Sequence, residues 1–417
     1  MAVEKEPLRR SLIPGGVCAA KGFRVAGVRC GIKRKRRDIA LLVCDAPDGK
    51  EATAAATFTQ NRLRAPCADR GETIIRNGDG EIRAIVVNAG NANAGNGPQG
   101  VKDNEAMAFL AAAEIGSEPS RVLTASTGII GNPMPMERVA SGIREAAAAL
   151  THSAEAASEA AEAILTTDTF SKEYAIEVEI DGFPVRIGGM AKGSGMIAPN
   201  MATMLAFITT DAAVAAPVLQ LALKRAVDIS FNRLTVDGDT STNDSCFLLA
   251  SGASGGADIQ DDQSPAFEDF LEALTEVCVH LAKEIARDGE GATKLVTVTV
   301  FGAEQEKDAD AIARTIAESP LVKTALFGND PNWGRILAAS GRAGVPFDPQ
   351  KVTATLAGTT IFSQGIPTDF DAAALSKTMS AKEVTITVDL SSGDATATFY
   401  TCDFSYDYVR INAEYHT

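Results

Sequence analysis

The pattern of apolar and polar positions divides the chain into short strand-like runs that alternate with alanine-rich helical runs. Alternating or continuous apolar residues over about four to eight positions predict β-strands. Strands are expected at Ile39–Val43, Arg83–Asn88, Val122–Thr124, Ile176–Ile180, Leu295–Phe301, Val352–Leu356, Val384–Leu390 and Ala395–Tyr400. Asp181-Gly182 and Gly393-Asp394, each beside one of these runs, are dipeptides typical of tight β-hairpins.

Helices are clearest where capping residues flank the helical period. One run begins at Asp103 and is closed by Gly116, and a second has Pro217 in its first turn. A third has Ser264 as its N-cap and continues toward Arg287. The alternation of strands and helices favours an α/β or α+β class.

The tetrapeptide Asp288-Gly289-Glu290-Gly291 interrupts the pattern after the third of these helices. Clusters of Gly and Asp mark loops, and a chain of 417 residues suggests about two to three domains. We therefore expect a catalytic α/β region over 1–287 and a C-terminal α+β domain over 288–417.

The charge balance argues against nucleic acid as the main partner. The formal net charge is −15, whereas duplexes are bound chiefly by neutralising phosphates with Lys and Arg. One basic run over 33–37 is compatible with a localisation or polyanion patch, but a solvated turn before the strand at Ile39 is the simpler interpretation. No stretch reaches the ~18 apolar residues of a membrane span and no signal-peptide core is visible, so we expect a cytoplasmic protein.

Cysteine and histidine usage limits the chemistry further. The seven cysteines are odd in number, scattered and without a C-x-x-C pair, which predicts reduced thiols and no structural metal site. The three histidines, His152, His280 and His416, lie in segments that show no sign of a catalytic dyad. Ser–His–Asp and Cys–His hydrolase chemistry is therefore disfavoured.

The most informative segment for chemistry covers residues 188–211. Glycines surround Lys192, and small residues then surround Thr203, which opens an apolar strand-like run. Glycine permits positive φ and close approach of a ligand, and a threonine at the start of a buried strand is held rigidly, as a nucleophile requires. A plain glycine-rich turn is the alternative. A phosphate loop does not fit, because Lys192 precedes its glycines.

A second glycine pattern, Gly95 to Gly100, satisfies G-x-G-x-x-G between a strand and a helix. The strand ends near Asn88, however, so six residues intervene before Gly95, and Pro98 stiffens the turn. A dinucleotide site is therefore disfavoured.

The run Lys192-Gly193-x-Gly195-Met196-Ile197-x-Pro199-x-Met201-Ala202-Thr203-Met204-Leu205 closely resembles the self-processing motif of the bifunctional ornithine acetyltransferase/N-acetylglutamate synthase (ArgJ) family of arginine biosynthesis. Blocks at 57–62, 88–93, 235–244 and 330–335 extend the resemblance over nearly the whole chain, in family order. The resemblance implies an α/β, ArgJ/DmpA-like self-processing fold with stacked β-sheets flanked by helices. It also implies autocatalytic cleavage between Ala202 and Thr203, giving an α chain over 1–202 and a β chain that begins with Thr203 as the nucleophile.

The segment Ser126–Gly131 is similar to the oxyanion-hole segment of that family. By this resemblance, Thr127 and Gly128 would donate hydrogen bonds to the tetrahedral intermediate. A turn of small residues can aim a hydroxyl and an N–H at one point, and removing one such donor typically raises the barrier by ~2.7–4 kcal/mol. A plain turn after the strand at Val122 is the alternative.

The resemblance also assigns the substrate-binding residues besides Thr203. Thr166, in a Thr-Thr-Asp-Thr block, would contact the substrate, Lys192 would bind its carboxylate and Glu290 would recognise its amino end. Asn412 and Thr417 match a C-terminal block that folds over the site in the family.

The implied reaction is a ping-pong transfer of the acetyl group from N2-acetyl-L-ornithine to L-glutamate. Cleavage frees an α-amine with a reference pKa of ~7.7–8.0, so Thr203 can supply its own base. No cofactor is expected, and no motif decides whether acetyl-CoA is a co-substrate. The resemblance implies two α and two β chains. The alternatives are a related N-terminal-nucleophile aminopeptidase or amidohydrolase, which generally has serine at this position, and a non-enzymatic binding protein, which would stay uncut.

Overall fold

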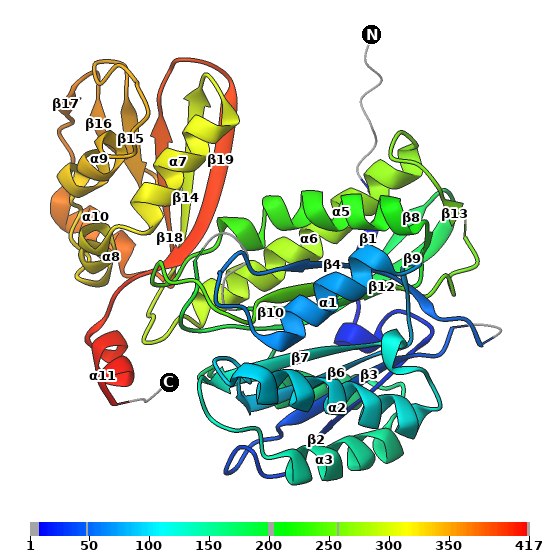
Figure 1. Ribbon diagram of the computed structural model, residues 1–417. Helices are drawn as coiled ribbons and strands as arrows, with labels where there is room; N and C mark the ends of the chain where they lie inside the picture. The colour runs from blue at the N-terminus through cyan, green and yellow to red at the C-terminus, as the bar shows by residue number, and fades with distance from the viewer. Residues whose placement is uncertain (1–7, 47–48, 199–203, 257, 415–417) are drawn as a thin grey trace.

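The structure is a computed structural model that describes residues 8–46, 49–198, 204–256 and 258–414. Two β-sheets lie one on the other in its larger part, and a third sheet stands beside them with its own helices (Figure 1). The chain ends, after the third sheet, in helix α11 (Tyr406–Glu414), which returns toward the stacked sheets.

The smaller of the stacked sheets has the strand order β2-β3-β6-β7. Its strands are β2 (Phe23–Val28), β3 (Ile39–Cys44), β6 (Ala84–Asn91) and β7 (Val122–Ile129). β6 and β7 run parallel, and the other neighbours are antiparallel. Helices α2 (Gly97–Ile115) and α3 (Met136–Ala149) cover its outer face, where Leu41, Val86 and Ile143 belong to one core cluster.

The larger stacked sheet has the strand order β1-β8-β9-β10-β12-β4-β5. Its strands are β1 (Arg10–Leu12), β8 (Lys172–Ile180), β9 (Phe183–Lys192), β10 (Leu205–Thr210), β12 (Ser245–Ala250), β4 (Ala52–Phe58) and β5 (Glu81–Ile82). The central strands β10 and β12 pair in parallel and are buried along their whole length, so both are apolar on both faces. Helices α5 (Ala216–Asp228) and α6 (Pro265–Arg287) cover the outer face of this sheet.

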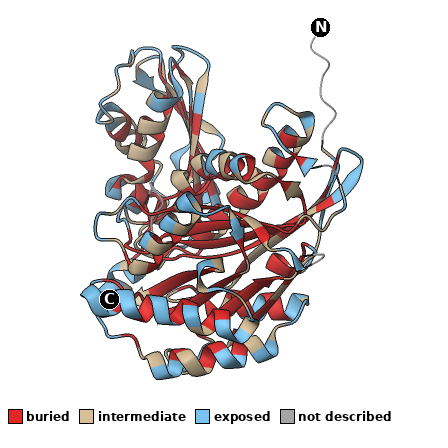
Figure 2. Cartoon of the chain, turned by 45° about the vertical axis from the view of Figure 1, so that its right-hand side comes forward, coloured by how far each residue is buried: buried red, intermediate tan, exposed pale blue. Residues whose placement is uncertain are grey.

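The two stacked sheets share one apolar core. Leu42 and Leu123 of the smaller sheet belong to the same cluster as Phe207 and Phe247 of the larger sheet. Helices α1 (Pro66–Asn77) and α4 (Ala154–Ala163) add residues to this layer, and Figure 2 shows the buried residues as a band between the helices. The structure therefore confirms the predicted fold class of stacked β-sheets flanked by helices.

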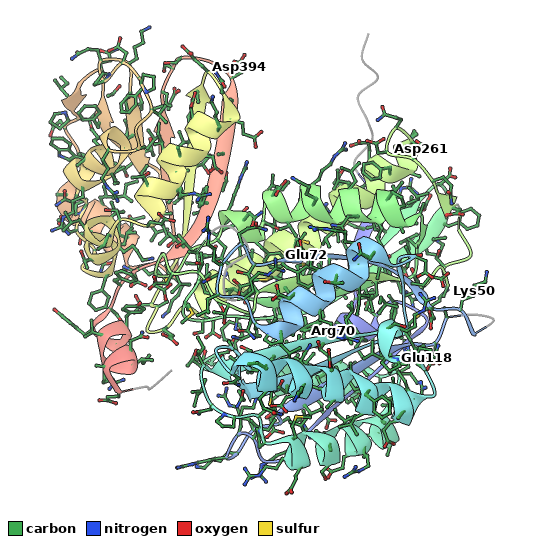
Figure 3. The ribbon with its side chains drawn as sticks, viewed as in Figure 1. Lys50, Arg70, Glu72, Glu118, Asp261 and Asp394 are labelled. Atoms are coloured by element: carbon green, nitrogen blue, oxygen red, sulfur yellow. The ribbon has the colours of Figure 1, made fainter. Side chains whose placement is uncertain are left out.

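Helix α1 is tied to the smaller sheet by a charged side chain. Arg70, labelled in Figure 3, donates hydrogen bonds to the carbonyl oxygens of Pro119 at 2.5 Å and Val122 at 2.7 Å. Because Val122 begins β7, these bonds fix the start of the strand that later carries Thr127.

The third sheet has the strand order β17-β16-β15-β18-β14-β19. Its strands are β14 (Leu295–Ala303), β15 (Thr353–Leu356), β16 (Thr359–Ser363), β17 (Ile366–Pro367), β18 (Glu383–Asp389) and β19 (Ala395–Cys402). Helices α7 (Glu306–Ala317), α8 (Pro320–Phe327), α9 (Trp333–Gly341) and α10 (Ala372–Met379) accompany it, and β11 (Ala213–Val214) pairs separately with β13 (Asp258–Ile259).

The predicted hairpin at Gly393-Asp394 was wrong. β14 lies between β18 and β19, parallel to the first and antiparallel to the second. The chain after β18 therefore crosses the end of β14 before it pairs. Ser392 and Gly393 donate their N–H groups to the carbonyl oxygen of Gly302 at 2.7 and 2.9 Å, so this glycine serves a crossover and not a tight hairpin.

The other sequence signals agree better with the structure. Asp181-Gly182 joins β8 and β9 with positive φ at both residues, as a two-residue hairpin requires. The Ser264 hydroxyl accepts the Phe267 N–H at 3.2 Å and starts α6. Helix α2 begins earlier than predicted, at Gly97 and not at Asp103, because the intervening Pro98 is compatible with the first helical turn.

The predicted boundary at residue 288 falls between α6, which ends at Arg287, and β14, which begins at Leu295. Leu295, Tyr400 and Cys402 pack in the same core cluster as α6, and the division into two domains stays a prediction. All seven cysteines lie in the described part of the chain, and each is a free thiol. Within the described ranges, no helix combines the length and the apolar character needed to cross a membrane.

Candidate active site

One pocket of about 140 Å³ gathers every predicted site residue that the structure describes. These residues are Thr127, Gly128, Thr166, Lys192, Glu290 and Asn412. They come from positions up to 285 residues apart in the sequence (412 − 127 = 285). The predicted residues Ala202, Thr203 and Thr417 lie outside the described residues.

The pocket has two walls that differ in origin. The inner wall consists of Thr127, Gly128, Thr166 and Lys192, which lie on or beside the stacked sheets. Thr127 and Gly128 are near the end of β7, and Lys192 is the last residue of β9. The outer wall consists of Glu290, from the loop between α6 and β14, together with Tyr408 and Asn412 of α11.

The oxyanion-hole pair on the inner wall depends on a close approach of two strands. Gly128 has φ 129°, and a Cβ at this position would overlap the backbone of Gly90 on the neighbouring strand β6. Only glycine fits without displacing β6. The Thr127 hydroxyl accepts a hydrogen bond from Lys192 Nζ at 3.3 Å, which leaves the hydroxyl proton free to be donated into the pocket.

Amide side chains hold the end of β7 from behind. The Ser126 hydroxyl donates to Asn88 Oδ1 at 2.7 Å, and Asn243 Nδ2 donates to the carbonyl oxygens of Ser126 at 2.9 Å and Ala92 at 2.7 Å. All three polar side chains are buried. The blocks at 88–93 and 235–244 therefore meet at the inner wall, where they fix the backbone that carries Thr127.

Lys192 is the buried cation of the inner wall. Its side chain reaches Thr127 while the residue is only 3% exposed. Burial lowers its pKa, and the negative charge of Asp168 opposes that shift. A substrate carboxylate beside Lys192 would act in the same direction as Asp168 and stabilise the ammonium form.

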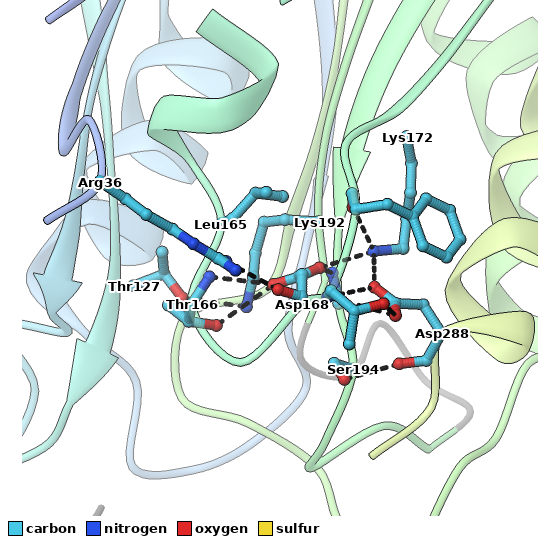
Figure 4. Close-up of polar contacts among 12 residues, drawn as sticks. Arg36, Thr127, Leu165, Thr166, Asp168, Lys172, Lys192, Ser194 and Asp288 are labelled. Atoms are coloured by element: carbon cyan, nitrogen blue, oxygen red, sulfur yellow. Dashed lines mark hydrogen bonds and ion pairs between the residues drawn. The ribbon is translucent and has the colours of Figure 1, made fainter. Parts of the chain in front are cut away.

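Behind Lys192 lies a buried chain of charges that joins three loops (Figure 4). Lys172 Nζ contacts Asp168 Oδ1 at 2.8 Å and Asp288 Oδ2 at 2.6 Å. Asp168 also accepts the Thr166 N–H at 2.9 Å and the Gly193 N–H at 2.7 Å. The network therefore fixes the backbone at Thr166 and directly after Lys192, the two substrate-binding candidates of this wall.

The protonation of Asp168 follows from its surroundings. Burial alone would raise the pKa of this carboxyl, but the charges of Lys172 and Lys192 and the hydrogen bonds of Lys172 and Thr166 hold it below its ordinary range. Asp168 is therefore ionised, and it partly balances both lysines. A buried pair of this kind is costly to break from one side, because the remaining charge has no compensation.

The outer wall is joined to the glycine-rich loop through Glu290. A Cβ at Gly195 would overlap the Glu290 carboxylate, so that contact requires glycine. The Glu290 N–H donates to the Ser194 carbonyl oxygen at 2.9 Å, and Glu290 Oε2 accepts a hydrogen bond from Asn412 Nδ2 at 2.8 Å. The carboxylate thus bridges the loop of Lys192 and the C-terminal helix.

Few contacts hold helix α11 against the loop that contains Glu290 and Gly291. None of its described residues is buried. A Cβ at Gly291, which has φ 69°, would overlap the Tyr408 N–H, and the Ser405 hydroxyl donates to the Gly291 carbonyl oxygen at 2.5 Å. Burial and the negative charges of Asp237 and Glu290 raise the pKa of Tyr408, so its phenol is protonated in the pocket.

Asp237 is a pocket residue to which no role could be assigned from the sequence. Burial raises its pKa to about 6, although hydrogen bonds from the backbone of Met196 and Ile197 oppose the shift. Met196 N donates to Asp237 Oδ2 at 2.7 Å and Ile197 N to Oδ1 at 2.9 Å. In the sequence, the only feature that pointed to Asp237 was its place within the 235–244 block, which resembles the family.

Comparison with known proteins identifies the family. The sequence model described as the ArgJ family matches residues 24–417, nearly the whole chain. The chain belongs to the ArgJ family. The predicted family is confirmed, and with it the prediction of an enzyme.

Curated relatives cover nearly the whole chain. "Arginine biosynthesis bifunctional protein ArgJ" of Symbiobacterium thermophilum is 50% identical over 410 residues, covering 97% of this chain and 99% of the relative. "Glutamate N-acetyltransferase" of Methanothermobacter thermautotrophicus is 47% identical over 414 residues, with 97% and 98% covered. Ornithine acetyltransferase of Mycobacterium tuberculosis, solved with ornithine, is 34% identical with a TM-score of 0.42, covering 46% of this chain and 98% of that chain.

The basic run over 33–37 was expected to be a solvated turn. In the structure, two of its side chains bind backbone carbonyl groups. Lys33 Nζ donates to the carbonyl oxygens of Ala163 at 3.1 Å and Leu165 at 2.8 Å, and burial lowers its pKa to about 8. Arg36 donates to the Asp168 carbonyl oxygen at 2.7 Å (Figure 4). These cations satisfy carbonyl groups at and after the end of α4, and so they help to position the ArgJ-like block at 166–169.

The block at 330–335 does not line the pocket. The Asn332 side chain accepts the Arg335 N–H at 3.1 Å and caps α9, and Arg335 donates to the Leu321 carbonyl oxygen at 2.8 Å. Trp333 stacks on Phe362 at a centroid distance of 5.6 Å. In the described structure, this ArgJ-like block organises the helices beside the third sheet.

Proposed function

We propose that the enzyme transfers the acetyl group of N2-acetyl-L-ornithine to L-glutamate, after cutting itself between Ala202 and Thr203. One observation carries the proposal. The predicted oxyanion, carboxylate-binding and amine-binding residues, which are far apart in the sequence, line a single pocket. The names of the relatives, glutamate N-acetyltransferase and ornithine acetyltransferase, agree with this reaction.

The charges of the pocket fit an amino-acid substrate. Lys192 on the inner wall offers a cation to the α-carboxylate, and Glu290 on the outer wall offers an anion to an ammonium group. Both N2-acetylornithine and glutamate have an α-carboxylate, so Lys192 can bind either substrate in the same orientation. The reacting carbonyl would then face Thr127 and Gly128.

The inner wall explains how an oxyanion would be stabilised. Because Thr127 Oγ1 accepts from Lys192, its own proton is available for the developing negative charge, together with the backbone N–H of Gly128. Both donors are held by β7 and its pairing with β6. They need little reorganisation when the charge develops.

Two acyl transfers would use the same hydroxyl. In processing, the Thr203 oxygen attacks the Ala202 carbonyl, and the C–N bond breaks as the nitrogen takes the hydroxyl proton and becomes a free α-amine. Water then opens the resulting ester, which gives a free carboxylate at Ala202 and restores the Thr203 hydroxyl. In turnover, that oxygen attacks the acetyl carbonyl of N2-acetylornithine, and ornithine leaves with the proton that the Thr203 amine has taken. The amine of glutamate then attacks the acetyl ester and restores the hydroxyl.

The test is the fragment pattern together with the transfer assay. Purified protein should give fragments 1–202 and 203–417, with Thr203 as the second amino terminus by mass analysis. The processed enzyme should form N-acetylglutamate from N2-acetylornithine and glutamate. Thr203→Ala should stay uncut and inactive while it folds. An intact wild-type chain, or a different junction, would refute the proposal.

Three further parts of the proposal need separate measurements. We propose acetyl-CoA as a second donor, in line with the "bifunctional" name of one relative, and glutamate acetylation with acetyl-CoA alone tests it. We also propose an assembly of two α and two β chains, which mass determination in solution tests. The proposed location is the cytoplasm, to be checked by fractionation.

A further inference from the structure

Residues 193–197 precede the segment that carries the proposed junction, and groups from distant parts of the chain hold them. The Gly193 N–H donates to Asp168 Oδ1 at 2.7 Å, and the Ser194 hydroxyl donates to the Asp288 carbonyl oxygen at 2.6 Å. The backbone of this glycine-rich stretch is therefore fixed by its neighbours.

The last two of these residues are held by one loop. Met196 N and Ile197 N donate to the two carboxylate oxygens of Asp237, and the Ile197 carbonyl oxygen accepts the Val236 N–H at 2.8 Å and the Thr235 hydroxyl at 3.2 Å. Met196 has φ 57°, a conformation that non-glycine residues seldom adopt. Its N–H bond to Asp237 helps to maintain it there.

Strand β12, which follows this loop directly, holds the chain on the other side of the junction. Ser245, directly after the 235–244 block, donates its N–H to the Met204 carbonyl oxygen at 3.2 Å, and Met204 is buried. Leu205 then enters β10, opposite Ser245 of β12 on one side and Lys192 of β9 on the other. Both ends of the junction segment are therefore anchored to one continuous stretch of chain.

We propose that residues 235–245, here called the junction clamp, position the chain for self-cleavage, with Asp237 as the main positioning residue. The inference rests on the self-cleavage proposed above. A hydroxyl attacks the preceding carbonyl only from a narrow range of geometries, and the rate depends on how often the chain occupies that range. Anchoring Ile197 to the loop and Met204 to the start of β12 fixes the two described residues that flank the junction relative to each other.

Asp237 lines the pocket, but its proposed role in processing can be tested separately from substrate binding. Each of its carboxylate oxygens accepts a backbone N–H of the segment before the junction. Removing the carboxylate would release Met196 and Ile197 before cleavage, whereas transfer by already processed enzyme relies on Thr127, Lys192 and Thr203. The clamp therefore predicts a larger loss in processing than in acetyl transfer.

The experiment follows self-cleavage of the full-length chain after cell-free synthesis, by denaturing gel and mass analysis over time. Asp237→Ala should slow cleavage at least about tenfold. Asp237→Asn keeps one acceptor oxygen and should fall between the wild type and Asp237→Ala. Acetyl transfer per cleaved chain, measured on processed protein, should fall by a clearly smaller factor than the cleavage rate.

Asp239→Ala is the matched control, since Asp239 lies in the same loop and beside the same pocket but is exposed. The carboxylate that accepts the N–H groups of residues 196–197 is that of Asp237, and not that of Asp239. The control variant should cleave at the wild-type rate. Thermal midpoints of all variants identify any loss of folding. The clamp would be refuted if Asp237→Ala cleaved like the wild type, or if transfer and cleavage fell by the same factor. A wild-type chain that stays uncut would instead refute the proposed function.

Discussion

The two walls of the pocket are built on different principles. The inner wall rests on strands of the stacked sheets and on a buried network in which Lys172 joins Asp168 to Asp288. The outer wall rests on a helix without buried residues, joined to Glu290 through Asn412. Burial and paired charges therefore fix the residues proposed for the chemistry. Helix α11 of the outer wall is held by a few polar contacts and by its close approach to one glycine.

This difference separates two kinds of expected defect. A change in the network behind the inner wall leaves buried charges uncompensated, so it should reduce stability and function together. A change in helix α11 of the outer wall removes exposed or half-buried contacts, so it should reduce substrate use at nearly constant stability.

The largest effect is expected for Lys172→Met. Removing this cation leaves Asp168 and Asp288 without their shared partner, and breaking a buried pair from one side costs about 3–5 kcal/mol. Urea unfolding should show this loss in the free energy of unfolding. The control is Lys323→Met, since Lys323 is equally buried but donates to the Thr401 hydroxyl and to the Cys402 carbonyl oxygen and thiol.

Because these acceptors are neutral, Lys323→Met should cost less, about 1–3 kcal/mol. If both variants lost the same free energy of unfolding, the paired charges behind the inner wall would contribute no more to stability than neutral hydrogen-bond acceptors do.

The next effect concerns substrate use. Lys192→Met removes the proposed carboxylate partner, and a hydrogen bond to a charged group contributes about 1.5–3 kcal/mol, which corresponds to a fall of roughly 10- to 150-fold in kcat/KM. Glu290→Gln should cause a similar fall for the amino end while keeping the contact with Asn412. Initial rates on processed enzyme are required, because Lys192 is close to the junction. Unchanged kinetics in both variants would contradict the assigned roles.

A smaller effect is expected for Asn412→Ala. The loss of one hydrogen bond to Glu290 costs about 0.5–1.5 kcal/mol, or roughly 2- to 10-fold in kcat/KM. Because α11 contributes no buried residue, the thermal midpoint should stay within about one degree of the wild-type value. A large fall in the midpoint would show that the outer wall supports the fold as the inner wall does.

A separate effect is expected in the pH dependence of stability. The folded-state pKa of Asp237, about 6, is above the ordinary value of 3.8. The folded state therefore binds this proton more tightly, so the resulting stability is present below about pH 4 and is lost as the pH rises toward 6. Relative to Asp237→Asn, the wild type should become less stable between pH 4 and 6.5. This assignment would be contradicted if the thermal midpoints of the wild type and of Asp237→Asn differed by the same amount at every pH in that range.

The inner wall could be predicted from the sequence because its residues lie in distinctive local motifs. Thr127, Thr166 and Lys192 each belong to a block that resembles the family, and the structure brings these blocks together. Lys172 could not be recognised in this way. Its importance depends on Asp288, 116 residues away in the sequence, and no local pattern reports that contact.

The errors at the level of the fold have the same origin. Gly393-Asp394 has the local chemistry of a hairpin, but β14, from about ninety residues earlier, pairs with both flanking strands, as is common when long-range pairing overrides a local preference. Likewise, the basic run was judged by its neighbours in sequence, whereas Lys33 and Arg36 bind carbonyl groups near α4. Local periodicity predicts which elements form, but not which elements they meet.

The insertion of β14 between β18 and β19 also has a consequence for the order of events during synthesis. β14 is complete at Ala303, yet its two partners begin only at Glu383 and Ala395. At roughly 5–20 residues per second, the ribosome needs several seconds to supply them. The stacked sheets and the junction clamp are made before that interval, and Tyr408 and Asn412 after it. The nascent enzyme therefore has its inner wall and Glu290 first, and it receives Tyr408 and Asn412 of the outer wall only after the third sheet has been made.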